Sequence, residues 1–122
     1  MIISFGWTTP ALLAGRKTVT RREWDPDYAQ RFFEGQLVDA WNTSPRNVRG
    51  CPRKIATIRL TKKPYLEPAR EAPDEDYEAE GFAYFDEIDR KVNGHTPTAM
   101  WRAWKQQNPS LWVVRFEVVE LV

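Results

Sequence analysis

Four cationic side chains stand within seven residues near the start of the chain: Arg16, Lys17, Arg21 and Arg22. The residues between them, 18–20, add two threonine hydroxyls, and Gly15 precedes the run. Guanidinium and ammonium groups bind phosphates and other oxygen-rich ligands, and hydroxyls add hydrogen bonds to the same ligand. Segment 15–22 is therefore a candidate ligand-binding edge, although a basic edge strand also serves to block aggregation between sheets.

A single carboxylate stands out at the end of the acidic stretch, where Glu80 precedes Gly81 and Phe82. Placed beside Lys17, Glu80 would form an ion pair or a general acid–base pair. Taken alone, the acidic stretch is more typical of a solvated face, and both interpretations stay open at this point.

Three tryptophans, Trp7, Trp24 and Trp41, flank the basic segments and suggest surfaces on which a nucleobase could stack. The alternative is that they pack in the hydrophobic core, which is what we expect, in large part, of Trp101, Trp104 and Trp112.

Several kinds of chemistry are excluded by composition. The chain of 122 residues has one cysteine, Cys51, and one histidine, His95, so we expect no internal disulfide, no zinc site and no Ser-His-Asp triad. We predict neither metal nor cofactor.

No window approaches the roughly 20 apolar residues of a membrane span, and residues 1–7 lack a signal-peptide pattern, so the expected location is cytoplasmic.

Charge is distributed unevenly along a chain whose net charge is only +1. Residues 1–63 carry twelve Lys or Arg and five Asp or Glu, whereas residues 64–122 carry six and twelve. The first half is the candidate side for a polyanion, unless the two halves neutralise each other in the fold.

Hydrophobic alternation and turn signals place the elements that must hold these residues. Helix starts are marked by Asp25 and Thr96, each followed by proline, and by the threonines 8 and 9 before Pro10. Gly15 marks a helix end. The proline-rich acidic segment 64–76 is expected to leave the sheet, because proline cannot donate to a strand ladder. Strands are predicted at 2–5, 17–22, 37–41, 54–61 and 111–121, and helices or helical turns at 10–14, 25–35, 77–81, 86–91 and 96–107.

This order of elements predicts an α+β fold, a small mixed β-barrel whose ends are covered by short helices. The length leaves room for one domain, spanning residues 1–122.

The sequence resembles ASCH domains of the PUA-like superfamily. The resemblance is carried, in order, by the helix and turn at 10–15, the basic run 15–22, the segment 35–38, the turn Glu80-Gly81-Phe82 and the closing strand 113–119. It covers most of the chain, segment 64–76 least. It implies a PUA-like barrel with a cleft beside the basic strand that binds RNA or a modified nucleoside.

Some ASCH proteins similar to this chain are amidohydrolases that remove the acetyl group of N4-acetylcytidine, and the resemblance assigns that catalysis to Lys17, Thr20 and Glu80. A desolvated lysine could act as base toward the threonine hydroxyl, with the glutamate handling the proton of the leaving amine. Strict strand alternation would put Lys17 and Thr20 on opposite faces, so catalysis requires a turn or bulge at Lys17. Further candidates for contact with the ligand or RNA are Arg16, Arg21, Arg22, Trp24 and Arg46.

The leading hypothesis is a module that binds RNA or a modified nucleoside, and the amidohydrolase is its principal alternative. A third hypothesis is a ribonuclease with the same fold, because Lys17 and Glu80 together could deprotonate a 2′-hydroxyl. A protein-interaction module, with the acidic loop 71–80 as its contact surface, is a fourth. The oligomeric state stays open.

Overall fold

The last strand organises the sheet. In the computed structural model, which describes all 122 residues, β6 (Ser110–Leu121) pairs with three other strands. Its first half lies between β2 (Val19–Arg22) and β5 (Tyr65–Pro68), and its second half pairs with β4 (Lys54–Leu60). These three pairings are antiparallel. One strand therefore connects the part of the sheet that carries the basic run to the rest.

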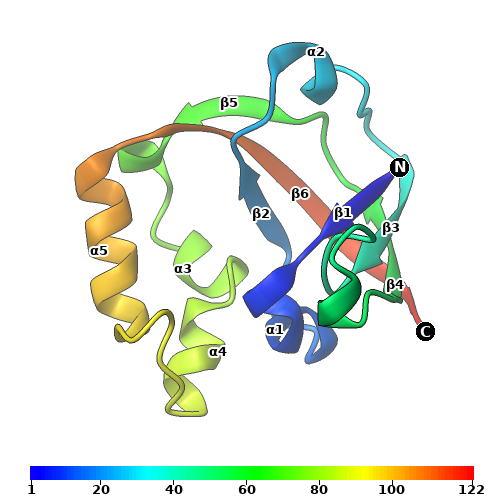
Figure 1. Cartoon of the computed structure of the whole chain (residues 1–122). Helices are drawn as coiled ribbons and strands as arrows, with labels where there is room; N and C mark the ends of the chain where they lie inside the picture. Colours follow the sequence, from blue (N-terminus) through cyan, green and yellow to red (C-terminus); the bar gives the residue numbers. More distant parts are fainter.

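The other end of the sheet is formed by β3 (Leu37–Trp41), antiparallel to β4, and β1 (Ile2–Ser4), parallel to β3. The order is β1-β3-β4-β6-β2, with β5 also on β6. The register shifts between Ala40 and Trp41 and between Thr57 and Ile58, and such bulges increase the twist and bend of a sheet. The six strands curl into a half-barrel (Figure 1).

Short helices complete the fold, and the predicted α+β class is confirmed. Helices α1 (Thr9–Leu13) and α2 (Pro26–Ala29) lie at opposite ends of the curled sheet, whereas the later helices gather on one side of it (Figure 1). These later helices are α3 (Asp76–Ala79), α4 (Phe82–Glu87) and α5 (Pro97–Gln107). Single 3₁₀ turns stand at η1 (Gly6–Thr8), η2 (Val48–Gly50) and η3 (Ala69–Glu71). None of the helices has the length and apolar character needed to cross a membrane.

The main core lies inside the curl of the sheet. Alternate residues of three neighbouring strands point into it, and Phe5, Leu12 and Phe32 close it from outside the strands. The residues that alternate in this way are Val38 and Ala40, Ile58 and Leu60, and Val114 and Phe116, and the strand residues Ile3, Ile55 and Ala56 join them.

A second, smaller cluster lies within the helical layer. The Phe82 ring centroid is 5.6 Å from those of both Tyr77 and Trp101, and Trp101 is in turn 5.3 Å from Trp104. The helices α3, α4 and α5 thus pack on one another through aromatic side chains, so that they form a coherent wall opposite β2.

The expectation that segment 64–76 leaves the sheet is wrong in its first part, because β5 pairs with β6. Pro64 precedes this strand and Pro68 is its last residue, so no proline stands at an interior position of the ladder. The predicted turn at 86–91 is also displaced, since α4 begins at Phe82. At the first helix, the Thr8 hydroxyl donates to the Phe5 carbonyl at 2.7 Å and does not cap the helix.

Gly81 is required where the helical layer meets α1. Its φ is +104°, and a Cβ there would lie 2.7 Å from the Cβ of Ala11. We expect Gly81→Ala to lower the free energy of unfolding by about 2 kcal/mol or more, because left-handed strain adds to the collision. The control is Gly15→Ala, at φ +75° with nothing near the added Cβ, which should lose only about 1 kcal/mol. Equal losses for the two variants in urea unfolding would contradict this account.

Candidate functional site

Lys17 lies in the segment that leads into β2, not in the strand itself, which begins at Val19. Gly15, at φ +75°, ends α1, and the backbone N–H groups of Arg16 and Lys17 then donate to the Ala11 carbonyl at 3.0 and 3.2 Å. On the other side, the N–H of Thr18 donates to the Ala79 carbonyl at 2.8 Å. Strand alternation therefore does not apply at Lys17.

The Glu80 carboxylate is held between two buried cations. Lys17 Nζ donates to Glu80 Oε1 at 3.0 Å and to the Glu80 backbone carbonyl at 2.8 Å. Arg21 Nη1 donates to Glu80 Oε2 at 2.8 Å. Glu80 follows the short helix α3, and its own N–H donates to the Asp76 carbonyl at 2.8 Å. The site thus joins β2 to the helical layer.

Arg21 extends this contact into a network of buried charges. Its Nη2 donates to Glu67 at 3.1 Å and also to Asp76. Asp76 accepts two further hydrogen bonds from Arg115, at 3.1 and 2.9 Å, and Arg115 Nε donates to the Tyr65 hydroxyl at 3.0 Å. Because a buried charge is stable only when it is paired, this network fixes the side of Arg21 that faces away from Glu80.

Burial changes the protonation of two groups in the network. It lowers the pKa of Lys17, which is only 2% exposed, and this effect exceeds the opposing attraction of Glu80, while Arg22 and Arg21 lower the pKa further. For Asp76, burial raises the pKa, but hydrogen bonds from Arg115 and Arg21 outweigh it and hold the pKa below the ordinary value. Lys17 is therefore the group most easily deprotonated among the cations of the site.

Arg22 differs from the other cations because it has no carboxylate partner. Its one hydrogen bond runs from Nε to Thr20 Oγ1 at 3.1 Å, and its guanidinium carbon lies 5.5 Å from the centre of the Phe5 ring. Burial lowers the pKa of Arg22, and Glu80 offsets this in part. Its two Nη groups make no hydrogen bond, so they are free to donate to a ligand oxygen.

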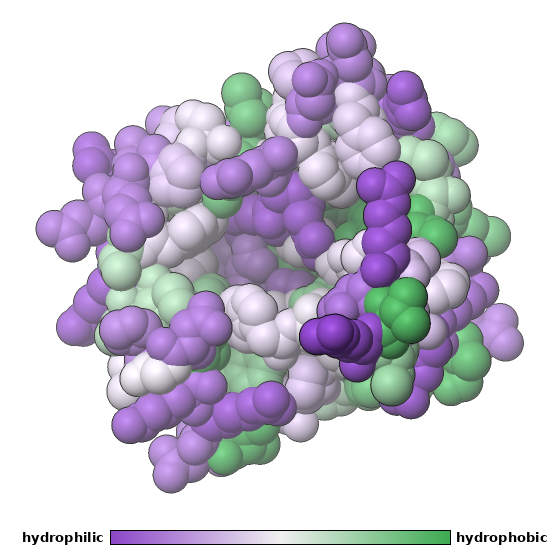
Figure 2. All heavy atoms as spheres, in the orientation of Figure 1, coloured by the Kyte–Doolittle hydropathy of each residue, from purple (hydrophilic) through white to green (hydrophobic).

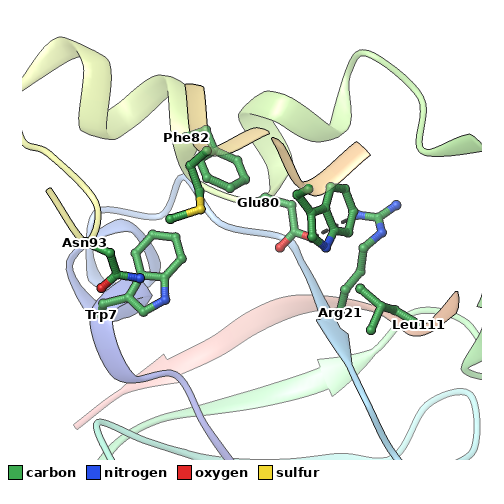
Figure 3. A pocket seen from close by; sticks show the side chains of 8 residues that line it. Trp7, Arg21, Glu80, Phe82, Asn93 and Leu111 are labelled. Atoms are coloured by element: carbon green, nitrogen blue, oxygen red, sulfur yellow. Dashed lines mark hydrogen bonds and ion pairs between the residues drawn. The ribbon is translucent and has the colours of Figure 1, made fainter. Parts of the chain in front are cut away.

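These side chains border a cleft made of two adjoining cavities. The polar cavity, of about 350 Å³, is bounded by segment 4–8 and by five of the predicted site residues: Lys17, Thr20, Arg21, Arg22 and Glu80. The second cavity, of about 240 Å³, is largely apolar and shares Trp7, Arg21 and Glu80 with the first. Figure 2 shows a hollow with hydrophilic residues at its centre, and Figure 3 shows the apolar cavity from close by.

Three of the predicted ligand contacts lie elsewhere. Arg16 pairs with Glu78 and Glu87, each at 2.6 Å, and so ties α3 and α4 together. Trp24 stacks on Phe32 at 4.5 Å against the main core. Arg46 is exposed in the loop before η2 and borders neither cavity.

Sequence reasoning missed several residues of the site, most clearly Asp76 and Arg115. One signal was present for Asp76, because it stands four residues before Glu80, a spacing that places two side chains on one face of a helix. Arg115 stands on β6 two residues after Val113, the partner of Arg21, and so lies on the same face as Arg21. That relation needs the strand register. No group of three or more His, Cys, Asp or Glu side chains is arranged to hold a metal ion.

Comparison with known proteins finds no family model and no curated protein that matches the chain. Among solved structures, a protein of Enterococcus faecalis V583, described by the family model DUF984, matches with a TM-score of 0.58. The two are 22% identical over 98% of this chain and 76% of that protein. The chain therefore shares its fold with this protein.

The pairing of Asp76 predicts a specific loss of stability in acid. The pKa of Asp76 is lower in the folded protein than in the unfolded chain, where it is about 3.9. The carboxylate therefore adds to the free energy of unfolding above that pH, and this contribution is lost as the pH falls below it. We expect Asp76→Asn to lose about 3 kcal/mol at neutral pH, since Arg115 loses its one charged partner and Arg21 loses one of three. The difference from wild type should shrink below about pH 4.

The matched control is Asp74→Asn, because Asp74 is fully exposed and lies 4.0 Å from Lys105. This variant should unfold like wild type at every pH. A difference between wild type and Asp76→Asn that stays constant from neutral to acid pH in chemical unfolding would contradict the assignment.

Proposed function

We propose that the chain binds a modified nucleoside in this cleft and hydrolyses the exocyclic amide of N4-acetylcytidine. The observation that carries the proposal is the buried Lys17, paired with Glu80, on the same cavity as the Thr20 hydroxyl. A lysine with a lowered pKa, a hydroxyl nucleophile and a carboxyl group are the three parts that such a reaction needs. The similarity of segment 15–22 to ASCH domains supports the same assignment.

In the structure both hydrogen bonds of Lys17 Nζ go to Glu80. In the proposed reaction the Lys17 side chain turns from Glu80 to the Thr20 hydroxyl on the same cavity, and neutral Lys17 removes its proton as Oγ1 attacks the acetyl carbonyl. The contact of 3.0 Å between Lys17 Nζ and Glu80 Oε1 offers a path by which that proton reaches Glu80. Glu80 then protonates the leaving exocyclic amine, and the C–N bond breaks to release cytidine. Water hydrolyses the acetyl ester on Thr20, which yields acetate and restores the hydroxyl.

Arg22 is suited to stabilise the negative charge that develops on oxygen. Its Nε already donates to the Thr20 oxygen at 3.1 Å, and its Nη groups have no other partner. A donor that is held in place before the reaction stabilises an oxyanion more than one in water, and the contact with Thr20 holds the partly buried Arg22 guanidinium. We therefore assign Arg22 to the tetrahedral intermediate.

Charge pairing favours a nucleoside-sized ligand over the phosphate backbone of RNA. Of the four cations in the basic run, Arg16, Lys17 and Arg21 pair with carboxylates of the acidic half. Cations that are already neutralised release few counterions on binding a polyanion, and so add little affinity for RNA.

The proposal predicts that the purified protein converts N4-acetylcytidine to cytidine, measured by chromatography. We expect Lys17→Ala, Thr20→Val and Glu80→Gln each to lower kcat by about a hundredfold or more, because each removes a group that transfers a proton or forms a bond. The control is Thr18→Val, since Thr18 is exposed and borders neither cavity. Absence of turnover by wild type, or equal effects of the two threonine changes, would refute the proposal.

A second prediction concerns the dependence of kcat/KM on pH. Because the base is neutral Lys17, activity should rise with pH and level off above a midpoint lower than the ordinary lysine pKa of about 10.4. Arg22 contributes to that lowered pKa, so Arg22→Gln should move the midpoint to higher pH as well as reduce the plateau. A midpoint that is unchanged or lower in Arg22→Gln would contradict Lys17 as the base.

A further inference from the structure

Apart from Glu80 at its edge, the apolar cavity next to the polar one takes no part in the proton transfers described above. Its five apolar lining side chains come from η1, α4, α5 and the start of β6: Trp7, Phe82, Met100, Trp104 and Leu111. At about 240 Å³ it is smaller than the pockets of roughly 300 to 1,000 Å³ that enclose drug-sized ligands. It therefore has the size and the apolar surface for one flat ring.

Trp7 has the properties of a fixed stacking surface. Its ring packs against Phe85 at 5.6 Å and Phe82 at 6.0 Å, yet the residue is 45% exposed. Aromatic side chains with one open face bind nucleobases by stacking, with little dependence on which base is present. Trp7 also borders both cavities, so a ring on it lies next to the reactive groups.

The three polar residues that line this cavity lie at its two ends. Glu80 and Arg21 stand where it joins the polar cavity, and both are engaged in ion pairs. Figure 3 shows Trp7 and Asn93 at one end and Arg21 and Leu111 at the other. Asn93 is the one carboxamide among the residues that line the two cavities, and it lies exposed in a turn. A carboxamide can donate to and accept from the edge of a nucleobase.

We infer that the apolar cavity is the compartment for a pyrimidine ring, which stacks on Trp7 and is recognised at its edge by Asn93. The inference rests on the proposed function and specifies how its substrate lies. With the ring in this compartment, the exocyclic nitrogen reaches the junction at Glu80, and the acetyl group enters the polar cavity beside Thr20 and Arg22. Trp7 and Asn93 are then residues that determine specificity.

The test uses cytidine, the product, which binds without reacting. In ¹⁵N-labelled protein each of the six tryptophans gives its own indole N–H signal. Cytidine should shift the signals of Trp7 and Trp104 in a saturable way and leave those of Trp24, Trp41 and Trp112 unchanged. A saturable shift confined to the latter three, or no shift at all, would overturn the inference.

Variants of the two residues give an independent measure of affinity. Trp7→Ala should weaken cytidine binding about tenfold or more, whereas Trp7→Phe, which keeps a ring, should stay within about threefold of wild type. Asn93→Gly, which removes the carboxamide in an exposed turn and suits the φ of +50° at this position, should weaken binding about threefold to tenfold. The control, Phe33→Ala, removes an exposed aromatic ring that borders neither cavity and should bind like wild type.

The same variants separate failure of this inference from failure of the proposed reaction. If wild type hydrolyses N4-acetylcytidine but Trp7→Ala and Asn93→Gly keep its KM and its affinity for cytidine, the ring compartment is wrong and the reaction stands. If wild type does not hydrolyse the amide but binds cytidine in a manner that depends on Trp7, the compartment stands and the reaction is wrong.

Discussion

The contact of the Glu80 carboxylate with Lys17 and Arg21 is the interaction on which the rest of the structure depends. It brings three ionisable groups into a largely buried position between the sheet and the helical layer. Charges in such a position are stable only when each is paired and hydrogen-bonded. Asp76 and Glu67 pair with Arg21, and Arg115 pairs with Asp76, so that each of these charges has a partner, whereas Arg21 Nε is buried and donates no hydrogen bond. Cations from the basic first half of the sequence thus pair with carboxylates from the acidic second half.

Two glycines allow this contact to form. Gly15 turns the chain sharply after α1, so that Lys17 enters the cleft before the strand begins. Gly81 lets the segment after Glu80 approach Ala11 more closely than any side chain would permit. Because α1 touches both segments, it sets the distance between lysine and carboxylate. The backbone therefore sets where the Lys17 and Glu80 side chains begin, and the hydrogen bonds between them hold their ends.

Local signals in the sequence predicted most elements of the fold. The helix 96–107 and the strand 37–41 agree with α5 and β3 within a residue, because cap residues and alternation are local properties. The strand β5 was missed since its prolines were weighed without knowing that they fall at its ends. At the site, the resemblance to ASCH domains, and not a local signal, predicted that Lys17, Thr20 and Glu80 lie together, and all three border one cavity. No local pattern reveals which cations pair with carboxylates or that Trp24 packs against the core. Both depend on contacts between residues that are distant in the sequence.

The central claim is that Thr20 attacks the acetyl group with Lys17 as its base. It is tested most directly by quenching the reaction with N4-acetylcytidine in acid during the first turnover and determining the mass of the intact protein and its peptides. The account predicts a fraction of protein heavier by one acetyl group, located on Thr20 and absent from Thr20→Val. Release of cytidine with no acetylated Thr20 at any time point, or with Thr20→Val as active as wild type, would contradict it.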